Sequence, residues 1–252
     1  VQYILIVTLI MTNFAGIISS IKDTIQNLVG FSYSLIPLLL ALMMITGNLV
    51  TASTVQSILL IMITFIGSFI ATFLLPMVLI GTSLGIISKI SDKVQIDKIA
   101  KTFKSSVVWI LGIVLTIFTT VLSLESSLTG HVDKITTKTT KAVVSNAIPV
   151  VGKILSDTTE MVLGSGIVLK NAVGIIGVIV IIGICAMPII RLAVLTALYH
   201  ILSAVCQPIA DKKIIDIIEQ MRDTFKVLLA MVCSISVMLI IGLTIVIKVS
   251  SI

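Results

Sequence analysis

Long apolar runs, separated by short polar joints, make up most of this chain. A helix needs roughly 20 apolar residues to cross a hydrocarbon core of about 30 Å. In lipid such a run must be helical, because every backbone amide has to find its partner within the segment. The pattern predicts an all-α, polytopic integral membrane protein with about seven to eight transmembrane helices, at residues 2–20, 32–47, 54–75, 77–90, 107–124, 166–187, 189–206 and 227–247.

Two prolines affect the predicted number of transmembrane helices. The run at 54–90 is 37 residues long and contains Pro76, and proline breaks helices because it lacks a backbone N–H. We therefore expect a full span before Pro76, and a short span, a re-entrant piece or the far half of a kinked helix at 77–90. Pro188 is expected to separate the span that ends at Met187 from the run at 189–206.

Three stretches carry helical periodicity with a polar face and are expected to lie at the membrane surface as amphipathic helices. They are residues 21–30, a first joint at 88–106 and a second joint at 211–226. In the first joint the apolar residues fall on one face, which leaves the lysines on the other; these apolar residues are Ile96, Ile99, Ala100 and Phe103.

The two joints resemble each other. Each begins with Asp-Lys, at 92–93 or 211–212, and ends with Thr-Phe-Lys, at 102–104 or 224–226, directly before a span. The sequence therefore predicts an internal repeat with halves at 54–124 and 166–249 inside a single transmembrane domain, 1–252. Three crossings between the joints would make the repeat inverted, as in many secondary transporters; an even number would make it parallel. The sequence leaves both open.

The longest polar region begins after Leu124 and is expected to form an exposed loop through Thr140. With the stretch that follows, it makes a predicted extramembrane segment at 125–160, part loop and part interfacial or re-entrant. Ser156 or Asp157 can cap a helix there, since a side-chain oxygen satisfies amides at a helix start. Whether residues 142–155 cross, enter or lie on the membrane is left open.

A stripe of small residues surrounds one cation at the start of the next span. Gly166, Lys170, Gly174 and Gly177 fall on one side of a helix, which is expected to face protein rather than lipid. For Lys170 two interpretations stand: an amine that snorkels or makes a structural pair, or a group that lines a pore or binds a substrate.

Three further polar residues lie in the same half of the chain. Asn171 can donate a hydrogen bond between helices. Arg191 follows Pro188 closely and is interpreted as an anchor at a helix end, and His200 as a packing residue or part of a proton relay. These residues and the stripe are the candidate pathway or helix-packing positions.

Composition supports the membrane class. The 252 residues are 58% hydrophobic and 11% charged, with a mean hydropathy of +1.26, far more apolar than a soluble domain. The net charge is +6, but the 17 Lys and Arg residues lie mostly in short joints between apolar runs, so they indicate membrane topology rather than nucleic-acid binding. The chain opens on Val1, which indicates a processed or trimmed form.

Catalytic chemistry is not indicated by the sequence. Its three cysteines, Cys185, Cys206 and Cys233, lack metal-site spacing and are interpreted as small buried apolar residues. No Gly-rich phosphate loop, ligand cluster or nucleophile with an adjacent base is present in the sequence. We predict that the protein is not an enzyme and needs no metal or other cofactor.

One long motif carries a family resemblance. The run IPVVGKILSDTTEMVLGSGIVLKNAVGIIGVIVI at 148–181, then Pro188 and QPIADKKI at 207–214, resembles the stage III sporulation protein AE family of endospore-forming Firmicutes. The likeness covers most of the chain and is strongest from Asn146 to Lys212.

The resemblance implies a multi-pass subunit of the complex that joins mother cell and forespore, located in the mother-cell membrane around the forespore. It implies a scaffold or channel, secretion-like or a feeding tube, required for forespore development. The implied partners are other stage III A operon proteins, including an ATPase, ring-forming and small membrane subunits, and forespore protein Q; a second copy is a further candidate. It carries over no catalytic residues. The alternative, motivated by the repeat and Lys170, is a small-solute permease of secondary-transporter type.

Overall fold

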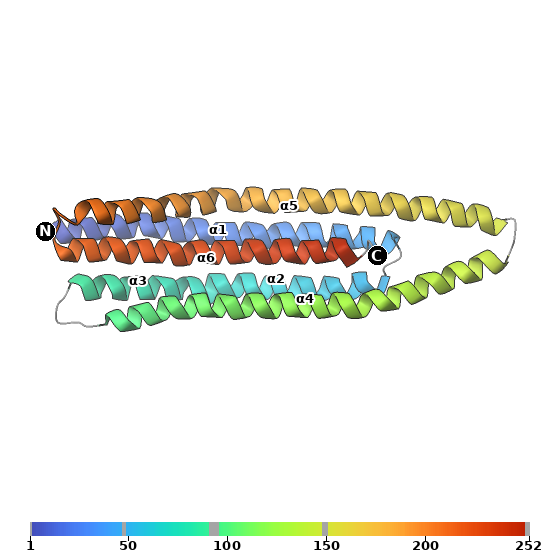
Figure 1. Ribbon diagram of the computed structural model, residues 1–252, viewed down its shortest axis with the longest axis horizontal. Helices are drawn as coiled ribbons and strands as arrows, with labels where there is room; N and C mark the ends of the chain where they lie inside the picture. The colour runs from blue at the N-terminus through green and yellow to red at the C-terminus, as the bar shows by residue number, and fades with distance from the viewer. Residues whose placement is uncertain (1, 47–48, 91–95, 148–150, 250–252) are drawn as a thin grey trace. The chain divides into compact units, whose positions relative to one another are not determined.

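The fold is entirely helical over the residues that the computed structural model describes, which are 2–46, 49–90, 96–147 and 151–249, with side chains described for 8–46, 54, 57–90, 96–124 and 164–248. The helices are α1 (Gln2–Ile45), α2 (Leu49–Phe69), a five-residue π-helix η1 (Ile70–Leu74), α3 (Leu75–Ile90), α4 (Asp97–Ala147), α5 (Val151–Cys206) and α6 (Lys212–Val249) (Figure 1). The predicted all-α class is confirmed.

Five segments of the described chain are long and apolar enough to cross a membrane. They are Thr8–Ile45, Ser57–Ile90, Asp97–Leu124, Gly164–Cys206 and Lys212–Lys248. The shortest has 28 residues, or about 42 Å at roughly 1.5 Å per residue, which exceeds a hydrocarbon core of about 30 Å. The protein is therefore polytopic, but the expected count of seven to eight spans is not confirmed.

The described residues give fewer candidate spans than expected because helices continue through positions that were expected to end them. Pro188 lies inside α5, and residues 21–30, expected between two spans, lie inside α1. Before Pro76 the backbone widens into η1, where the Leu75 amide donates to the Ile70 carbonyl, five residues back. A π-turn and an apolar setting, where a broken helix would leave backbone groups without water, both favour continuation past a proline.

Residues 21–30 do not form a separate interfacial helix, because they belong to α1. Their apolar positions Ile21, Ile25 and Leu28 are buried and continue a stripe that starts at Phe14 and Ile17. The helical periodicity there reflects packing against other helices, and periodicity alone cannot distinguish that from packing on a bilayer surface.

The expected loop at 125–140 is helical instead, since α4 runs to Ala147. Lysine is a good helix former and threonine a moderately weak one, and no proline interrupts the stretch. The polar composition of this stretch therefore did not distinguish a loop from a helix. Its position outside the membrane stays a prediction. Of the stretch 142–155, residues 148–150 lie outside the described part of the chain.

The chain divides into two compact units, each taking residues from several helices. Unit 1 comprises Val1–Leu28, Phe65–Leu115 and Gly183–Ser236; unit 2 comprises Val29–Thr64, Thr116–Ile182 and Val237–Ile252. The core of unit 1 includes Phe14, Val78, Val107, Leu192 and Phe225, and that of unit 2 includes Leu39, Leu59, Phe118, Ile181 and Leu239. Neither unit coincides with a proposed repeat half, so the repeat stays a prediction.

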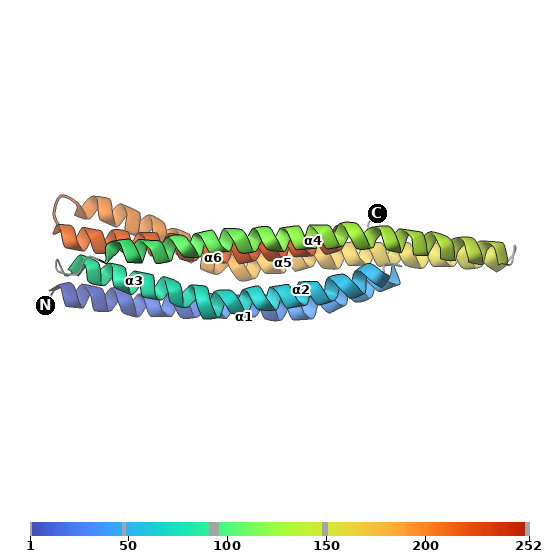
Figure 2. The same cartoon turned by 90° about the horizontal axis from the view of Figure 1, so that it is seen from below.

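The two joints lie together in unit 1. The Lys213 amine donates to the Ile90 carbonyl at 3.4 Å, and Lys89 lies 3.9 Å from Asp216. The ends of α3 and α5 accordingly appear at the same end of unit 1 in both views (Figures 1 and 2). Only α4 and α5 run between the joints, an even number, so the contacts favour a parallel over an inverted repeat.

Candidate functional site

The small-residue stripe of α5 packs in unit 2 against α1 and α6. Gly166, Gly174 and Gly177 are buried. A Cβ added to Gly174 would overlap the Ile247 side chain, one on Gly177 would lie 2.5 Å from Leu35 Cδ2, and one on Gly166 would lie 2.9 Å from Thr46 Cγ2. The stripe thus allows close approach of three helices.

Lys170 lies within this stripe and is fully buried, with 0% of its surface exposed. Its Nζ donates to the Ile247 carbonyl at 2.7 Å. Ile247 is among the last four residues of α6, whose carbonyls lack partners within the helix and favour cations. Lys170 therefore caps the C-terminus of α6. Next to it Asn171 is half-buried, and its Oδ1 accepts no hydrogen bond from the described residues.

Arg191 and His200 are not brought together with the stripe. Both lie in unit 1, on the part of α5 that follows Gly183, and both are exposed. Arg191 was expected at a helix end, but it lies within α5, which continues through Pro188 as far as Cys206. The candidate residues from sequence therefore fall into two separate groups.

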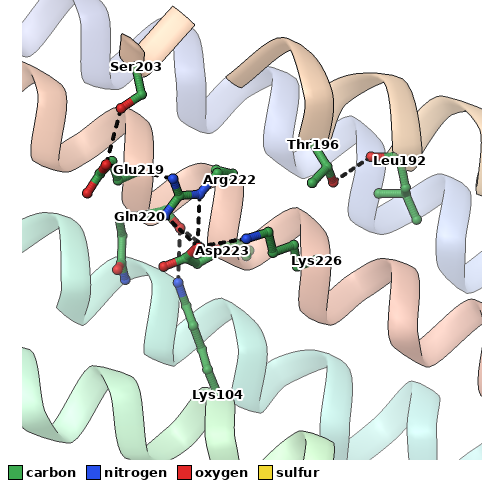
Figure 3. A network of polar contacts seen from close by, with 10 residues as sticks. Lys104, Leu192, Thr196, Ser203, Glu219, Gln220, Arg222, Asp223 and Lys226 are labelled. Atoms are coloured by element: carbon green, nitrogen blue, oxygen red, sulfur yellow. Dashed lines mark hydrogen bonds and ion pairs between the residues drawn. The ribbon is translucent and has the colours of Figure 1, made fainter. Parts of the chain in front are cut away.

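A second buried polar cluster, which the sequence reasoning missed, joins α3, α4 and α6 in unit 1 (Figure 3). Lys104 is 7% exposed, and its Nζ donates to the Gln220 backbone carbonyl at 3.0 Å. The side-chain amide of Gln220, 6% exposed, donates to the Gly81 carbonyl at 3.4 Å. Lys104 had been placed on the polar face of the first joint; instead it points into the protein.

Two threonines extend this cluster. The hydroxyls of Thr82 and Thr224 are 3.0 Å apart, and Thr224 also donates to the Gln220 carbonyl at 2.9 Å. Gly81 and Gly85 make room for these contacts, since a Cβ on Gly85 would overlap the Gln220 amide. Gly81 and Gly85 form a G-x-x-x-G pair, the sequence signal that predicts close helix packing in membranes.

Charged residues at the rim of the cluster pair with one another on α6. Arg222 lies 3.1 Å from Asp223 and 3.7 Å from Glu219, and Ser203 of α5 donates to Glu219 at 3.2 Å (Figure 3). These carboxylates are partly exposed, so each pair stabilises by about 1 kcal/mol or less. The buried cluster beneath them fixes the helices more strongly.

Both buried amines thus bind backbone carbonyls rather than carboxylates or a cavity. The described residues contain no group of three His, Cys, Asp or Glu side chains that could hold a metal. A cavity that includes Leu35 and Leu243, both neighbours of Gly177, has a volume of about 10 Å³, enough for about one water molecule. The arrangement suits helix packing.

Replacing Gly177 with valine should lower the stability of unit 2 by roughly 1–3 kcal/mol, because two added methyl groups meet Leu35 and Leu243 in a packed interface. Thermal unfolding in detergent measures this. The matched control is Gly183→Val on the same helix, where nothing lies within 4 Å of an added Cβ. Equal melting temperatures for the two variants would contradict the packing role.

Comparison with known proteins agrees with the resemblance noted in the sequence. The family model described as stage III sporulation protein AE matches residues 1–250. Stage III sporulation protein AE of Bacillus subtilis (strain 168) is 29% identical over 247 residues, which cover 98% of this chain and 62% of that protein. The chain thus spans less than two thirds of that relative's length. No solved structure matches.

The family match covers every residue that the structure describes, including the stripe around Lys170 and the cluster around Lys104. Together with the five long apolar helices, it confirms the family expected from the motif at 148–214. The chain belongs to the stage III sporulation protein AE family.

Proposed function

We propose that this protein is a membrane scaffold or channel subunit of the sporulation complex that joins mother cell and forespore. The observation that carries the proposal is the family match over residues 1–250 on a chain with five helices long and apolar enough to cross a membrane. The expected location is the mother-cell membrane around the forespore.

The buried polar groups support a scaffold more than a permease. Lys170 caps a helix end, and the cavity beside its stripe, at about 10 Å³, is far smaller than typical ligand sites of roughly 300–1,000 Å³. The permease alternative was motivated by the proposed repeat and by Lys170, and the contacts between the joints support a parallel form of that repeat rather than the inverted form seen in many secondary transporters. We therefore assign Lys170 a structural role.

The distribution of basic residues supports an orientation. The joints carry nine of the 17 Lys and Arg residues, namely Lys89, Lys93, Lys98, Lys101, Lys104, Lys212, Lys213, Arg222 and Lys226. Segments rich in Lys and Arg favour the cytoplasmic side. We therefore place both joints in the mother-cell cytoplasm, where an ATPase of the stage III A operon could reach them, with ring-forming subunits and forespore protein Q as further proposed partners.

Lys170→Met in the full-length protein tests this function in sporulating cells. The variant keeps the aliphatic stem but leaves the Ile247 carbonyl without its amine. We expect reduced co-purification with the other stage III A proteins and a matching loss of spores. Lys98→Met, at an exposed position, is the control and should behave as wild type.

Other outcomes separate the alternatives. Normal assembly of the complex with loss of forespore development would favour transport through the protein. Normal assembly and normal spore yield would contradict the role given to Lys170. Failure of the unmodified protein to co-purify with any stage III A protein would contradict the scaffold proposal itself.

A further inference from the structure

Arg191 is an exposed cation within an exposed apolar face of α5. Met187 and Ile190 before it and Val194 and Leu198 after it are all exposed, Met187 to 75%. Arg191 forms no hydrogen bond or ion pair with the described residues. Whatever covers this face must therefore cover the guanidinium too, and a charged group inside an apolar environment needs a partner.

Asp23 is an exposed anion at the same level of unit 1, on α1. Phe225 of α6 contacts both Phe14 of α1 and Tyr199 of α5, with ring centroids 6.3 and 5.1 Å apart, so these rings share one level. Asp23 lies nine residues after Phe14 and Arg191 eight before Tyr199. The two helices run in opposite directions through unit 1, so both charges are displaced the same way, by about 12–14 Å.

Neither charge lies at the level of the second joint, which the sequence predicts to lie at the membrane surface. Phe225 belongs to that joint, so Asp23 and Arg191 lie about 12–14 Å beyond its level, inside their apolar segments. The aspartate side chain is short and cannot extend to the membrane surface as lysine or arginine can. Lys22 is adjacent in sequence, and neighbours at i and i+1 do not face each other on a helix.

We propose that Arg191 of one copy pairs with Asp23 of a second copy of this chain, which packs α5 of one against α1 of the next. A phosphate headgroup could satisfy Arg191 but would leave Asp23 without a partner, whereas a second copy satisfies both. The two surfaces differ, so the contact is head-to-tail and produces a ring when the rotation closes. This inference does not depend on the sporulation role proposed above.

Disulfide cross-linking between two differently tagged full-length copies tests the contact. Both copies lack the native Cys185, Cys206 and Cys233; one carries Asp23→Cys and the other Arg191→Cys. Oxidation of membranes should give a dimer that carries both tags. In the control the second copy carries Ala193→Cys, an exposed position about 200° around the helix from Arg191, and should give none.

Charge exchange provides a second readout that does not rely on cysteine. Asp23→Arg or Arg191→Asp alone should cause loss of the oligomer on native gels, and the double exchange should restore it. Absence of the two-tag dimer at normal expression would overturn the proposal. So would an unchanged oligomer in both single variants, or a disulfide that forms only within one copy carrying both cysteines. Co-purification with stage III A proteins is measured separately, so a failure of the contact between copies can be distinguished from a failure of the proposed scaffold role.

Discussion

Replacing Gly85 with leucine is expected to force α3 away from α6 in unit 1 and to lower the free energy of unfolding by about 3 kcal/mol, near the upper end for overpacked cores. A Cβ at this position already overlaps the Gln220 amide. That amide donates to the Gly81 carbonyl, and displacing it leaves a buried polar group without a partner, which costs roughly 1–3 kcal/mol. Chemical or thermal unfolding in detergent measures the loss.

Two further variants make the test specific. Gly112→Leu introduces the same side chain on α4, where nothing lies within 4 Å of an added Cβ, and should change stability little. The milder Gly85→Ala should be rescued in part by Gln220→Ala, because the double variant removes the overlapping amide. Strict additivity of these two substitutions would show that the residues do not interact and would contradict the packing described here.

The class of the protein and the existence of its helices followed from hydropathy alone, whereas their number did not. Pro76 and Pro188 look like breaks, yet α3 and α5 accommodate them. A single sequence does not reveal whether neighbouring helices will support the backbone around a proline. The polar stretch after Leu124 shows the same limit, because polarity reports solvent contact and not backbone conformation.

The candidate site was predictable where spacing alone places residues on one face. The stripe around Lys170 follows from steps of four and three residues, and its glycines are buried. The Lys170 amine binds the Ile247 carbonyl, 77 residues away. Spacing along the chain could not predict this contact, because it depends on the end of α6 lying beside α5. The role assigned to the stripe in transport or assembly stays a proposal.

Lys104 shows why a helical wheel can mislead. Its neighbours in the first joint place it with the other lysines, but Ile99 is 51% exposed while Lys104 is 7% exposed. The wheel assumes one apolar side, whereas α4 packs against both α3 and α6 here through Gly81 and Gln220. Lysine enters this interface because its amine finds a carbonyl there. The G-x-x-x-G pair at Gly81 and Gly85 was the available signal.

Reversing the charge at Lys104 should be the most damaging single substitution in this cluster. In Lys104→Glu a carboxylate would replace the amine that now lies 3.0 Å from the Gln220 carbonyl, so two acceptors would face each other in a buried site. Loss of about 3–5 kcal/mol is expected, as for a buried charge left without a partner. The measurement is the melting temperature of the purified protein in detergent, with cross-checks on its yield from membranes.

Lys104→Met should be far milder, which separates the loss of an amine from the gain of a repelling charge. Methionine fills much of the same volume, and the Gln220 carbonyl still accepts from Thr224 at 2.9 Å, so the expected change is about 1 kcal/mol or less. Lys98→Glu, on the exposed side of the same helix, should change stability by roughly 0.5 kcal/mol at most. If Lys104→Glu were as stable as Lys98→Glu, the ammonium would have to lie in water, and the buried contact between α4 and α6 would be wrong.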